Sequence, residues 1–114
     1  MVSTTETERA VYVQRINPDR KDEYLDAHDD VPSGVTNAMK RGGVTNFELF
    51  VRDDIAVCIL EAKDLETYNE VMAADPDVEE WERYVAQFKT EGVDVDADEP
   101  IPYMTEVWSF EPET

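Results

Sequence analysis

The sequence contains very little of several residue types that mark the common classes of small protein. It has a single cysteine, Cys58, so a disulfide framework within the chain is excluded and a cysteine-based metal site is not expected. No apolar stretch approaches the ~20 residues that a membrane-spanning helix needs. The first residues, Met1 to Glu6, lack the basic and apolar regions of a signal peptide. These absences predict a cytoplasmic protein that does not act in or on a membrane.

Basic residues are also scarce. Ten Lys and Arg against 28 Asp and Glu give a formal net charge of −18 and a pI near 4.1. Nucleic acid is therefore not an expected partner, because phosphate binding depends on patches of Lys and Arg. Anionic membranes and acidic substrates are disfavoured for the same reason. The acids are spread along the whole chain, which favours a surface solvated in high salt, and hence a halophilic source, over an acidic patch for a basic partner.

The residues that are present suffice for one small globular domain. With 114 residues, of which 41% are hydrophobic, the chain is expected to form a single domain over residues 1–114, with the polar residues 1–8 flexible. A domain of this size buries only about two-thirds of the surface that its unfolded chain exposes. A second subunit would therefore add useful burial.

Two similar helix starts divide the chain. Residues 17–19 and 75–77 each place a capping side chain before a proline at the first helical position and an acid in the first turn. The first helix carries Tyr24 and His28 and should end near residue 29 or 30, because Pro32 disfavours a helical residue before it. The predicted elements are strand 10–16, helices 17–30 and 33–40, strands 44–51 and 55–62, a helical segment from residue 65, a helix from residue 76 with the apolar stripe Val78, Trp81, Val85 and Phe88, an acidic loop 90–102, and a last strand 103–110.

This order of elements, β-α-β-β-α-β, predicts a ferredoxin-like α+β fold. In that fold a four-stranded antiparallel sheet carries its helices on one face. The candidates for the opposite face, Phe50, Cys58, Leu60 and Trp108, are too apolar to be left in water. Either a second copy packs sheet against sheet, or this face lines a ligand pocket.

No motif for a cofactor or metal is present. The sequence lacks a phosphate-binding loop, a dinucleotide fingerprint, zinc-ligand spacing and a nucleophile elbow. We therefore expect no cofactor and no metal.

The single histidine is the strongest candidate for chemistry. Tyr24 and His28 are four residues apart and so share one face of the first helix. A lone histidine is more often structural, but this one lies at a helix end beside Asp26 and Asp29, and both features favour its protonated form. A proton donor at neutral pH suits the opening of a cyclic sugar, which needs an acid at the ring oxygen and a base at the anomeric hydroxyl. Helical spacing alone favours Trp81 as a core residue over a platform for the C–H face of a sugar.

Several motifs follow one another in a distinctive order over residues 9–110. They are Ala10–Asp19 with Glu23-Tyr24 and His28, Lys40–Phe47, the strand that ends at Glu61, Trp81 with Arg83-Tyr84, and Glu106-Val107. Together they resemble the L-rhamnose mutarotase family. The spacing of Asn-Pro-Asp, Glu-Tyr and His, followed by a strand that begins Gly-Val-Thr-Asn-Phe, is the most specific part of the resemblance.

The resemblance implies a cofactor-free isomerase that acts on a monosaccharide, interconverting α- and β-L-rhamnopyranose, and a homodimer whose two sheets face each other. It also implies that His28 is the proton donor and that Tyr24 binds the sugar. Trp81 matches the first residue of a Trp-Trp pair that lines the family's pocket, which reverses the preference for a core role.

Three positions depart from the family pattern. Glu82 replaces the second tryptophan of that pair and could accept hydrogen bonds from sugar hydroxyls. Phe47 replaces a substrate-binding tyrosine, keeping the ring and losing the hydroxyl. Residues 29–32 replace a Trp-Pro step after His28. The substrate could thus be L-rhamnose, a related deoxysugar such as L-fucose, or a hydroxylated sugar. The base that partners His28 stays open among Glu82, Glu106 and a tyrosine hydroxyl.

Two other functions stay open on the same scaffold. One is a non-catalytic module that binds a sugar or a partner. The other is a cofactor-free oxygenase of the dimeric ferredoxin-like type, for which the sequence offers no positive indication.

Overall fold

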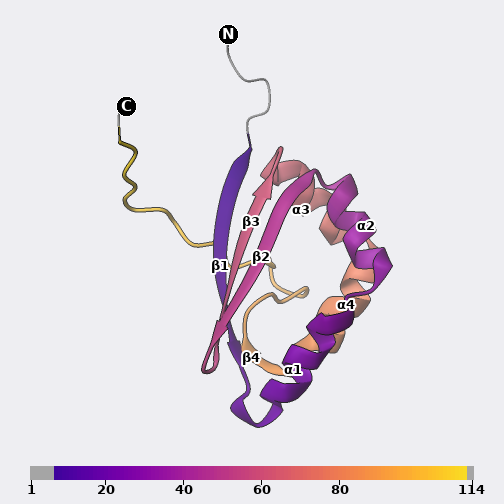
Figure 1. The fold of residues 1–114 in the computed structure, drawn as a ribbon. Coiled ribbons are helices and arrows are strands. Elements are labelled where there is room, and N and C mark those ends of the chain that lie inside the picture. Colours follow the sequence, from indigo (N-terminus) through magenta and orange to yellow (C-terminus); the bar gives the residue numbers. More distant parts are fainter. Residues whose placement is uncertain (1–6, 113–114) are drawn as a thin grey trace.

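Four strands form one antiparallel sheet in the computed structural model of the protein, which describes residues 7–112. Their spatial order is β2-β3-β1-β4, and the helices cover one face of the sheet (Figure 1). This is the ferredoxin-like α+β fold that the sequence predicts. The elements are β1 (Glu8–Ile16), a 3₁₀ turn (Pro18–Arg20), α1 (Lys21–Ala27), a second 3₁₀ turn (His28–Asp30), α2 (Ser33–Arg41), β2 (Val44–Arg52), β3 (Ile55–Ala62), α3 (Leu65–Ala74), α4 (Pro76–Ala86) and β4 (Lys89–Glu91).

Glu8, the last residue of the N-terminal segment predicted to be flexible, belongs to the first strand. This residue opens β1 opposite Ala62, and its carboxylate accepts a hydrogen bond of 2.8 Å from the backbone N–H of Leu65. The strand therefore begins two residues earlier than its apolar pattern indicates. The rest of that prediction concerns residues 1–6, which lie outside the described part of the chain, and Thr7, which precedes the strand.

Residues directly opposite each other on antiparallel strands share a face of the sheet. Tyr12 of β1 lies opposite Cys58 of β3, which in turn lies opposite Leu49 of β2, and this row faces the helices. The prediction that Cys58 and Leu60 point outward is therefore wrong, since both are buried beneath the helices. β3 is apolar at almost every position, so its pattern does not indicate which alternate set faces the helices.

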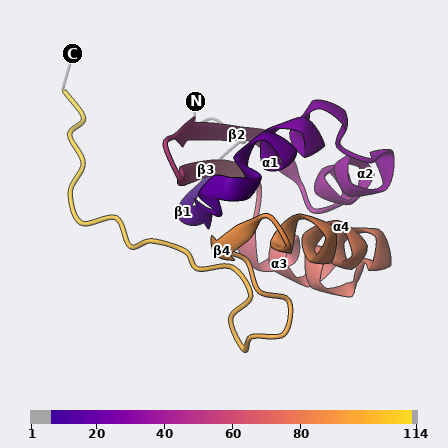
Figure 2. The ribbon, with the colours of Figure 1, turned by 90° about the horizontal axis from the view of Figure 1, so that it is seen from below.

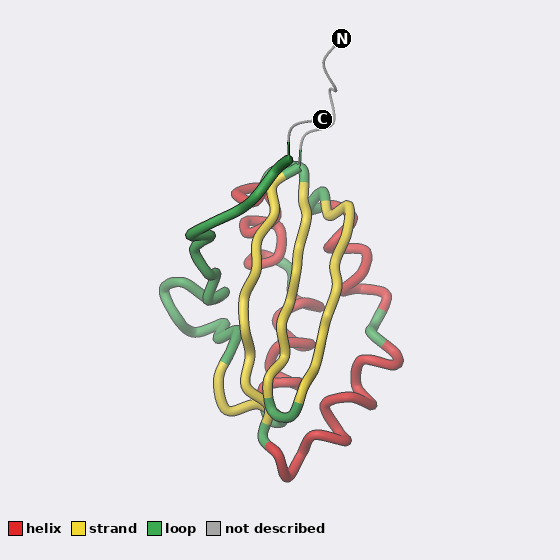
Figure 3. Tube along the Cα trace, turned by 60° about the vertical axis from the view of Figure 1, so that its left-hand side comes forward, coloured by secondary structure: helices red, strands yellow, loops and turns green. Residues whose placement is uncertain are grey.

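No helix of residues 7–112 covers the opposite face of the sheet (Figure 3). Its central row is Val13, Val57 and Phe50, one residue from each long strand, and the Phe50 side chain is 54% exposed. The prediction that Phe50 points outward is confirmed. An apolar face of this kind needs a cover.

Both predicted helix starts are confirmed. The side chain of Asn17 accepts a 3.0 Å hydrogen bond from the N–H of Asp19. Asp75 accepts from the N–H groups of Asp77 and Val78, at 2.8 and 3.1 Å. These bonds satisfy donors that a helix start otherwise leaves free. The helices form two rows over the sheet, α1 with α2 and α3 with α4 (Figure 2).

Two buried clusters make up the core between sheet and helices. Helix α4 ends at Ala86, so Phe88 is not on the helix as predicted, but it is buried from the connection to β4. The first cluster consists of Ile16, Tyr24, Ala56 and Phe88, and the second of Leu60, Ala62 and Tyr68.

The predicted strand 103–110 is wrong. Tyr103 makes an isolated bridge to Tyr12, and Met104 donates a 2.7 Å hydrogen bond to the carbonyl of Val11. The chain then leaves the sheet edge and runs away from the body of the protomer (Figure 1). The fourth strand is instead β4, which overlaps the start of the predicted acidic loop. The alternating apolar residues of the last segment have strand propensity, but no neighbouring strand pairs with them here.

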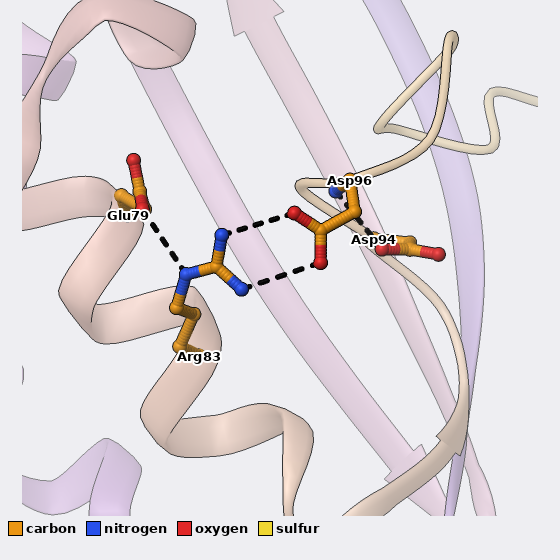
Figure 4. Close-up of polar contacts among 4 residues, drawn as sticks. All are labelled: Glu79, Arg83, Asp94 and Asp96. Carbon is orange, nitrogen blue, oxygen red and sulfur yellow. Dashed lines mark hydrogen bonds and ion pairs between the residues drawn. The ribbon is translucent and has the colours of Figure 1, made fainter.

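Residues 92–103, which we call the cover segment, connect β4 to this bridge. Gly92 has a positive φ of 148°, and a Cβ atom there would lie 2.5 Å from the Gln14 side-chain oxygen. That oxygen accepts a hydrogen bond of 3.2 Å from the N–H of Val93. Arg83 of α4 donates two hydrogen bonds to the Asp96 carboxylate, at 3.0 and 3.3 Å (Figure 4). The cover segment is thus held against both the sheet and α4.

Candidate functional site

His28 lies where the first helix tightens into a 3₁₀ turn. Its backbone N–H bonds to the carbonyl of Leu25, three residues back, which leaves the carbonyl of Tyr24 without its usual helical donor. The His28 Nδ1 atom lies 2.8 Å from that carbonyl oxygen. A carbonyl only accepts hydrogen bonds, so Nδ1 carries a proton and Nε2 is the nitrogen that can gain or lose one.

Aromatic rings hold the imidazole of His28 on two sides. The Tyr24 ring lies 4.6 Å from it, centroid to centroid, at an angle of 44°. Trp81 of α4 approaches it edge to face at 5.4 Å and 79°. Tyr84 continues the row beyond Trp81, at 6.2 Å. The structure therefore brings together three of the residues that the sequence singles out, His28, Tyr24 and Trp81.

Trp81 and Tyr84 line a groove of about 570 Å³ between α1, α2 and α4. We call it the Trp81 groove. Its other walls include Asp26, Asp30 and Ser33. Aromatic rings flanked by carboxylates and a hydroxyl suit a sugar, which presents apolar C–H faces and a rim of hydroxyl groups.

The hydroxyl of Tyr24 points the other way, into the interior. Tyr24 is fully buried, and its hydroxyl has no hydrogen-bond partner among the described residues. Burial raises the pKa of Tyr24, and a negative charge on the nearby Glu82 raises it further. The phenol therefore stays protonated, as a donor whose partner is missing.

Glu82 lies on a different side of α4 from Trp81. It lines a cavity of about 630 Å³ between α3, α4, β1 and the cover segment, which we call the Glu82 cavity. Burial raises the pKa of the Glu82 carboxyl, and the nearby Lys89 offsets only part of the increase. Burial in turn lowers the pKa of Lys89. No ion pair joins Glu82 to another residue in the described range.

Phe47 takes a third position. Its ring packs against the cluster of Leu60, Ala62 and Tyr68, from the second long strand of the sheet. Tyr68 also lines the Glu82 cavity, so Phe47 borders the interior on that side and makes no ring contact with His28 among the described residues. The five candidate residues thus fall into one group around His28 and a second around the Glu82 cavity.

Sequence reasoning missed several polar residues of the interior. Tyr12, Gln14 and Lys89 lie near Glu82, and the Lys89 ammonium donates to the Gln14 side-chain oxygen. In the sequence, the only indication that this interior is not purely apolar is the alternation of Tyr12 and Gln14 with valines along β1.

Metal and membrane sites do not emerge from the described residues. Within residues 7–112, no three His, Cys, Asp or Glu side chains gather closely enough to hold a metal ion. None of the helices in this range is long and apolar enough to cross a membrane.

The sheet order and the helices on one face define a ferredoxin-like α+β protein. A family model described as L-rhamnose mutarotase matches residues 9–110, nearly the whole chain. The chain therefore belongs to the L-rhamnose mutarotase family. No curated protein matches it in sequence.

Solved structures share the fold at low sequence identity. An L-rhamnose mutarotase from Formosa agariphila is 18% identical with a TM-score of 0.70, and the match covers 91% of this chain and 99% of that one. Tetracenomycin F2 cyclase from Streptomyces glaucescens is 22% identical with a TM-score of 0.61, over 93% and 99% of the two chains. At these identities the likeness shows the fold alone.

Proposed function

We propose that the protein is a sugar mutarotase, an isomerase that interconverts the α and β anomers of L-rhamnopyranose or a related deoxyhexose without a cofactor. Membership of the family supports the reaction class. The observation that carries the proposal is the setting of His28. Its Nδ1 is tied to the Tyr24 carbonyl and its ring is held by Tyr24 and Trp81, so one defined nitrogen, Nε2, is left to exchange a proton.

The reaction needs two proton transfers. His28 in its cationic form donates a proton from Nε2 to the ring oxygen O5, while a base removes the proton of the O1 hydroxyl. The C1–O5 bond breaks, its electron pair stays on O5, and C1 becomes an aldehyde. Rotation about C1–C2 presents the other face of the aldehyde. Closure reverses both transfers and restores the acid and the base.

The remaining candidate residues bind and orient the sugar. Trp81 supplies a flat surface for a C–H face of the ring. The unpartnered Tyr24 hydroxyl, which faces the interior rather than the Trp81 groove, supplies a donor to a sugar that reaches between Tyr24 and Glu82. Phe47 and Glu82 contribute an apolar wall and a hydrogen-bond acceptor. For the base, Glu106 is exposed in the segment after Tyr103, so within one protomer the inward-facing Glu82 or a tyrosine hydroxyl is the better candidate.

We infer that the active form is a homodimer that uses the open face of the sheet. Phe50 and Ile55 on this face are 54% and 40% exposed, and a row of valines continues between the strands. Trp108 and Phe110 add exposed aromatic surface near the chain end, at 78% and 70%. Two such faces packed together would remove this apolar surface from water, as the hydrophobic effect favours.

The cellular setting is proposed from charge. A net charge of −18 on a single domain of 114 residues suits a cytoplasm rich in salt, where screening over a few ångströms reduces repulsion between the carboxylates. Assays should accordingly be run at high salt.

The direct test is a panel of aldoses screened by exchange NMR for accelerated interconversion of anomers, at high salt and with catalytic amounts of protein. We expect acceleration for L-rhamnose or a related deoxyhexose. Acceleration for no sugar in the panel would contradict the proposal. Binding of a sugar by titration without acceleration would instead identify a non-catalytic sugar-binding module.

A further inference from the structure

Lys89 is a partly buried amine that the proposed reaction does not use. It is the first residue of β4 and lies opposite Ile16 of β1, so its side chain shares the inward face of the sheet with that of Gln14. Its Nζ atom donates a hydrogen bond to the Gln14 side-chain oxygen. Within residues 7–112, no ion pair joins Lys89 to a carboxylate. A lysine that points inward without a counter-ion is uncommon, because burial of an unpaired ammonium is costly.

The amine lines a pocket of about 500 Å³ where α4, β4 and the cover segment meet, which we call the Lys89 pocket. Its volume is within the range of small-molecule sites. Apolar walls come from the cover segment, at Val93, Val95 and Pro102. The Gln14 oxygen that accepts from Lys89 also accepts a hydrogen bond of 3.2 Å from the N–H of Val93. The amine and one wall of the pocket are therefore fixed by the same side chain.

The Lys89 pocket is separate from the Glu82 cavity. The two have only Glu82, Val93 and Val95 in common, and no tyrosine lines the Lys89 pocket. What distinguishes the pocket is thus its amine.

Burial and charge act on this amine in opposite directions. Burial lowers the pKa of Lys89, and a negative charge on Glu82 offsets only part of the decrease. The titratable and charged groups around the amine come from four parts of the fold: Glu82 and Arg83 on α4, Cys58 on β3, Glu91 on β4, and Asp94 and Asp96 on the cover segment. At a given pH, a larger share of Lys89 is therefore the neutral amine than of a lysine in water.

A neutral amine held in this way can add to a carbonyl group. Its bond to Gln14 uses an N–H, because the Gln14 oxygen is an acceptor, and so leaves the nitrogen lone pair free. The lone pair forms a bond to the carbonyl carbon of an aldehyde, and a proton moves from nitrogen to the carbonyl oxygen. The resulting hydroxyl group then leaves with the second nitrogen proton as water, and a C=N bond forms. One amine and one aldehyde thus give one imine and one water.

The charges of the pocket favour an uncharged aldehyde. Its lining residues include the acids Glu82, Glu91, Asp94 and Asp96, but only two bases, Arg83 and Lys89. Arg83 is already paired with Asp96 and with Glu79 (Figure 4). A carboxylate or phosphate on the aldehyde would therefore meet an excess of negative charge.

We propose that Lys89 is a covalent site that captures small uncharged aldehydes as imines in the Lys89 pocket. This activity goes beyond the proposed mutarotase reaction, in which no bond to the protein forms, and it does not depend on His28.

Reductive trapping tests the proposal on the full native chain. The protein is incubated at pH 7 and high salt with propanal and cyanoborohydride, which reduces an imine to a stable secondary amine, and the modified residues are located by peptide mass spectrometry. The other lysines, Lys21, Lys40 and Lys63, are internal references. We expect Lys89 to react at least tenfold faster than each of them, since a pKa lower by one gives about ten times more free amine at neutral pH. Its rate should also level off at a lower pH than theirs.

Lys89→Arg keeps the positive charge but cannot form an imine. In this variant residue 89 should stay unmodified, while the reference lysines react as in the native chain. The matched control is Lys63→Arg, in which Lys89 should react at the native rate. Glyoxylate, a small anionic aldehyde, tests the preference for an uncharged ligand: the ratio of the Lys89 rate to the Lys63 rate should be at least tenfold lower than with propanal.

A native Lys89 that reacts no faster than the reference lysines would overturn the proposal, as would a pH profile identical to theirs. An equal ratio of rates with glyoxylate and propanal would overturn the assignment of an uncharged aldehyde. His28→Asn should trap propanal at Lys89 at the native rate, so loss of anomer exchange and loss of trapping are separate results. Loss of trapping in His28→Asn would contradict the independence of the two sites.

Discussion

Trp81 and Glu82 are consecutive residues of α4, yet their side chains line cavities on different sides of the helix. Successive residues of an α-helix point about 100° apart, so a pair at adjacent positions can serve two surfaces. In this protein Trp81 contacts His28, while Glu82 faces Tyr12 and Tyr68. The aromatic and the acidic member of the pair therefore border different spaces.

Replacement of Glu82 should raise stability at neutral pH. Burial raises its folded-state pKa above the unfolded value of about 4.3, so the ionised form costs stability as pH rises from about 4.3 through the folded-state pKa. Below that window both states are protonated and the cost vanishes. We expect Glu82→Gln to melt at a higher temperature than the native chain at pH 7, with a smaller difference at pH 4. Equal melting temperatures at pH 7 would contradict this expectation. The control variant is Glu80→Gln, which removes an exposed carboxylate instead of a buried one.

Asp75, which caps α4, should contribute more to the free energy of unfolding than other surface acids do. Asp75 accepts hydrogen bonds from two N–H groups at the start of α4 and pairs with Arg41 of α2. Asp75→Ala should lower the free energy of unfolding by about 1 kcal/mol or more, since loss of a helix cap costs about 0.5–2 kcal/mol. Urea unfolding followed by circular dichroism measures it. A loss no larger than that of Glu80→Ala would argue against the cap.

The ion pair between Arg83 and Asp96, which ties the cover segment to α4 and which we call the tether, should weaken in acid and in high salt. Arg83 lowers the pKa of Asp96, so the tether is complete above the unfolded value of about 3.9 and is lost as pH falls through the lower folded-state pKa. Salt should weaken it because both side chains are exposed.

The measurement is amide hydrogen exchange of residues 93–100, which slows where the Arg83–Asp96 ion pair holds the cover segment. The rates are corrected for the intrinsic effect of pH. Arg83→Met should speed exchange there at neutral pH, whereas Arg52→Met at the end of β2 should not. Unchanged protection in Arg83→Met would show that the tether does not hold the cover segment.

The open face of the sheet should carry the subunit contact. Phe50→Asp puts a charge at the centre of this face without disturbing the core beneath the helices, so the variant should fold and sediment as a monomer where the native chain forms dimers. Leu25→Asp, on α1 and 39% exposed, is a control that should leave the dimer intact. Sedimentation velocity at high salt distinguishes the two. A native monomer, or a dimeric Phe50→Asp variant, would contradict the proposed interface.

The sequence predicted most of this architecture because its signals are local. The caps at Asn17 and Asp75 and the apolar strands each depend on a few neighbouring residues, and they yielded the correct order of elements. The orientation of Cys58 could not be predicted, because β3 is apolar on both faces. The segment after Tyr103 was wrong because strand propensity says nothing about whether a neighbouring strand is present.

The candidate site was predictable only in part. The i, i+4 spacing placed Tyr24 and His28 together, as the structure shows. Their contact with Trp81 depends on how α1 packs beside α4, which no local pattern encodes. The Glu82 cavity depends on the cover segment and so could not be inferred from spacing.

The central claim is that His28 moves the proton through Nε2. His28→Asn is the sharpest variant, because its amide can replace Nδ1 at the Tyr24 carbonyl but offers nothing at the position of Nε2. Exchange NMR with an accepted aldose, alongside circular dichroism to verify the fold, compares it with the native chain. The account predicts a folded protein whose rate enhancement falls about 10²–10⁴-fold, the range for loss of a general acid–base group. A folded His28→Asn protein that exchanges anomers at the native rate would contradict it.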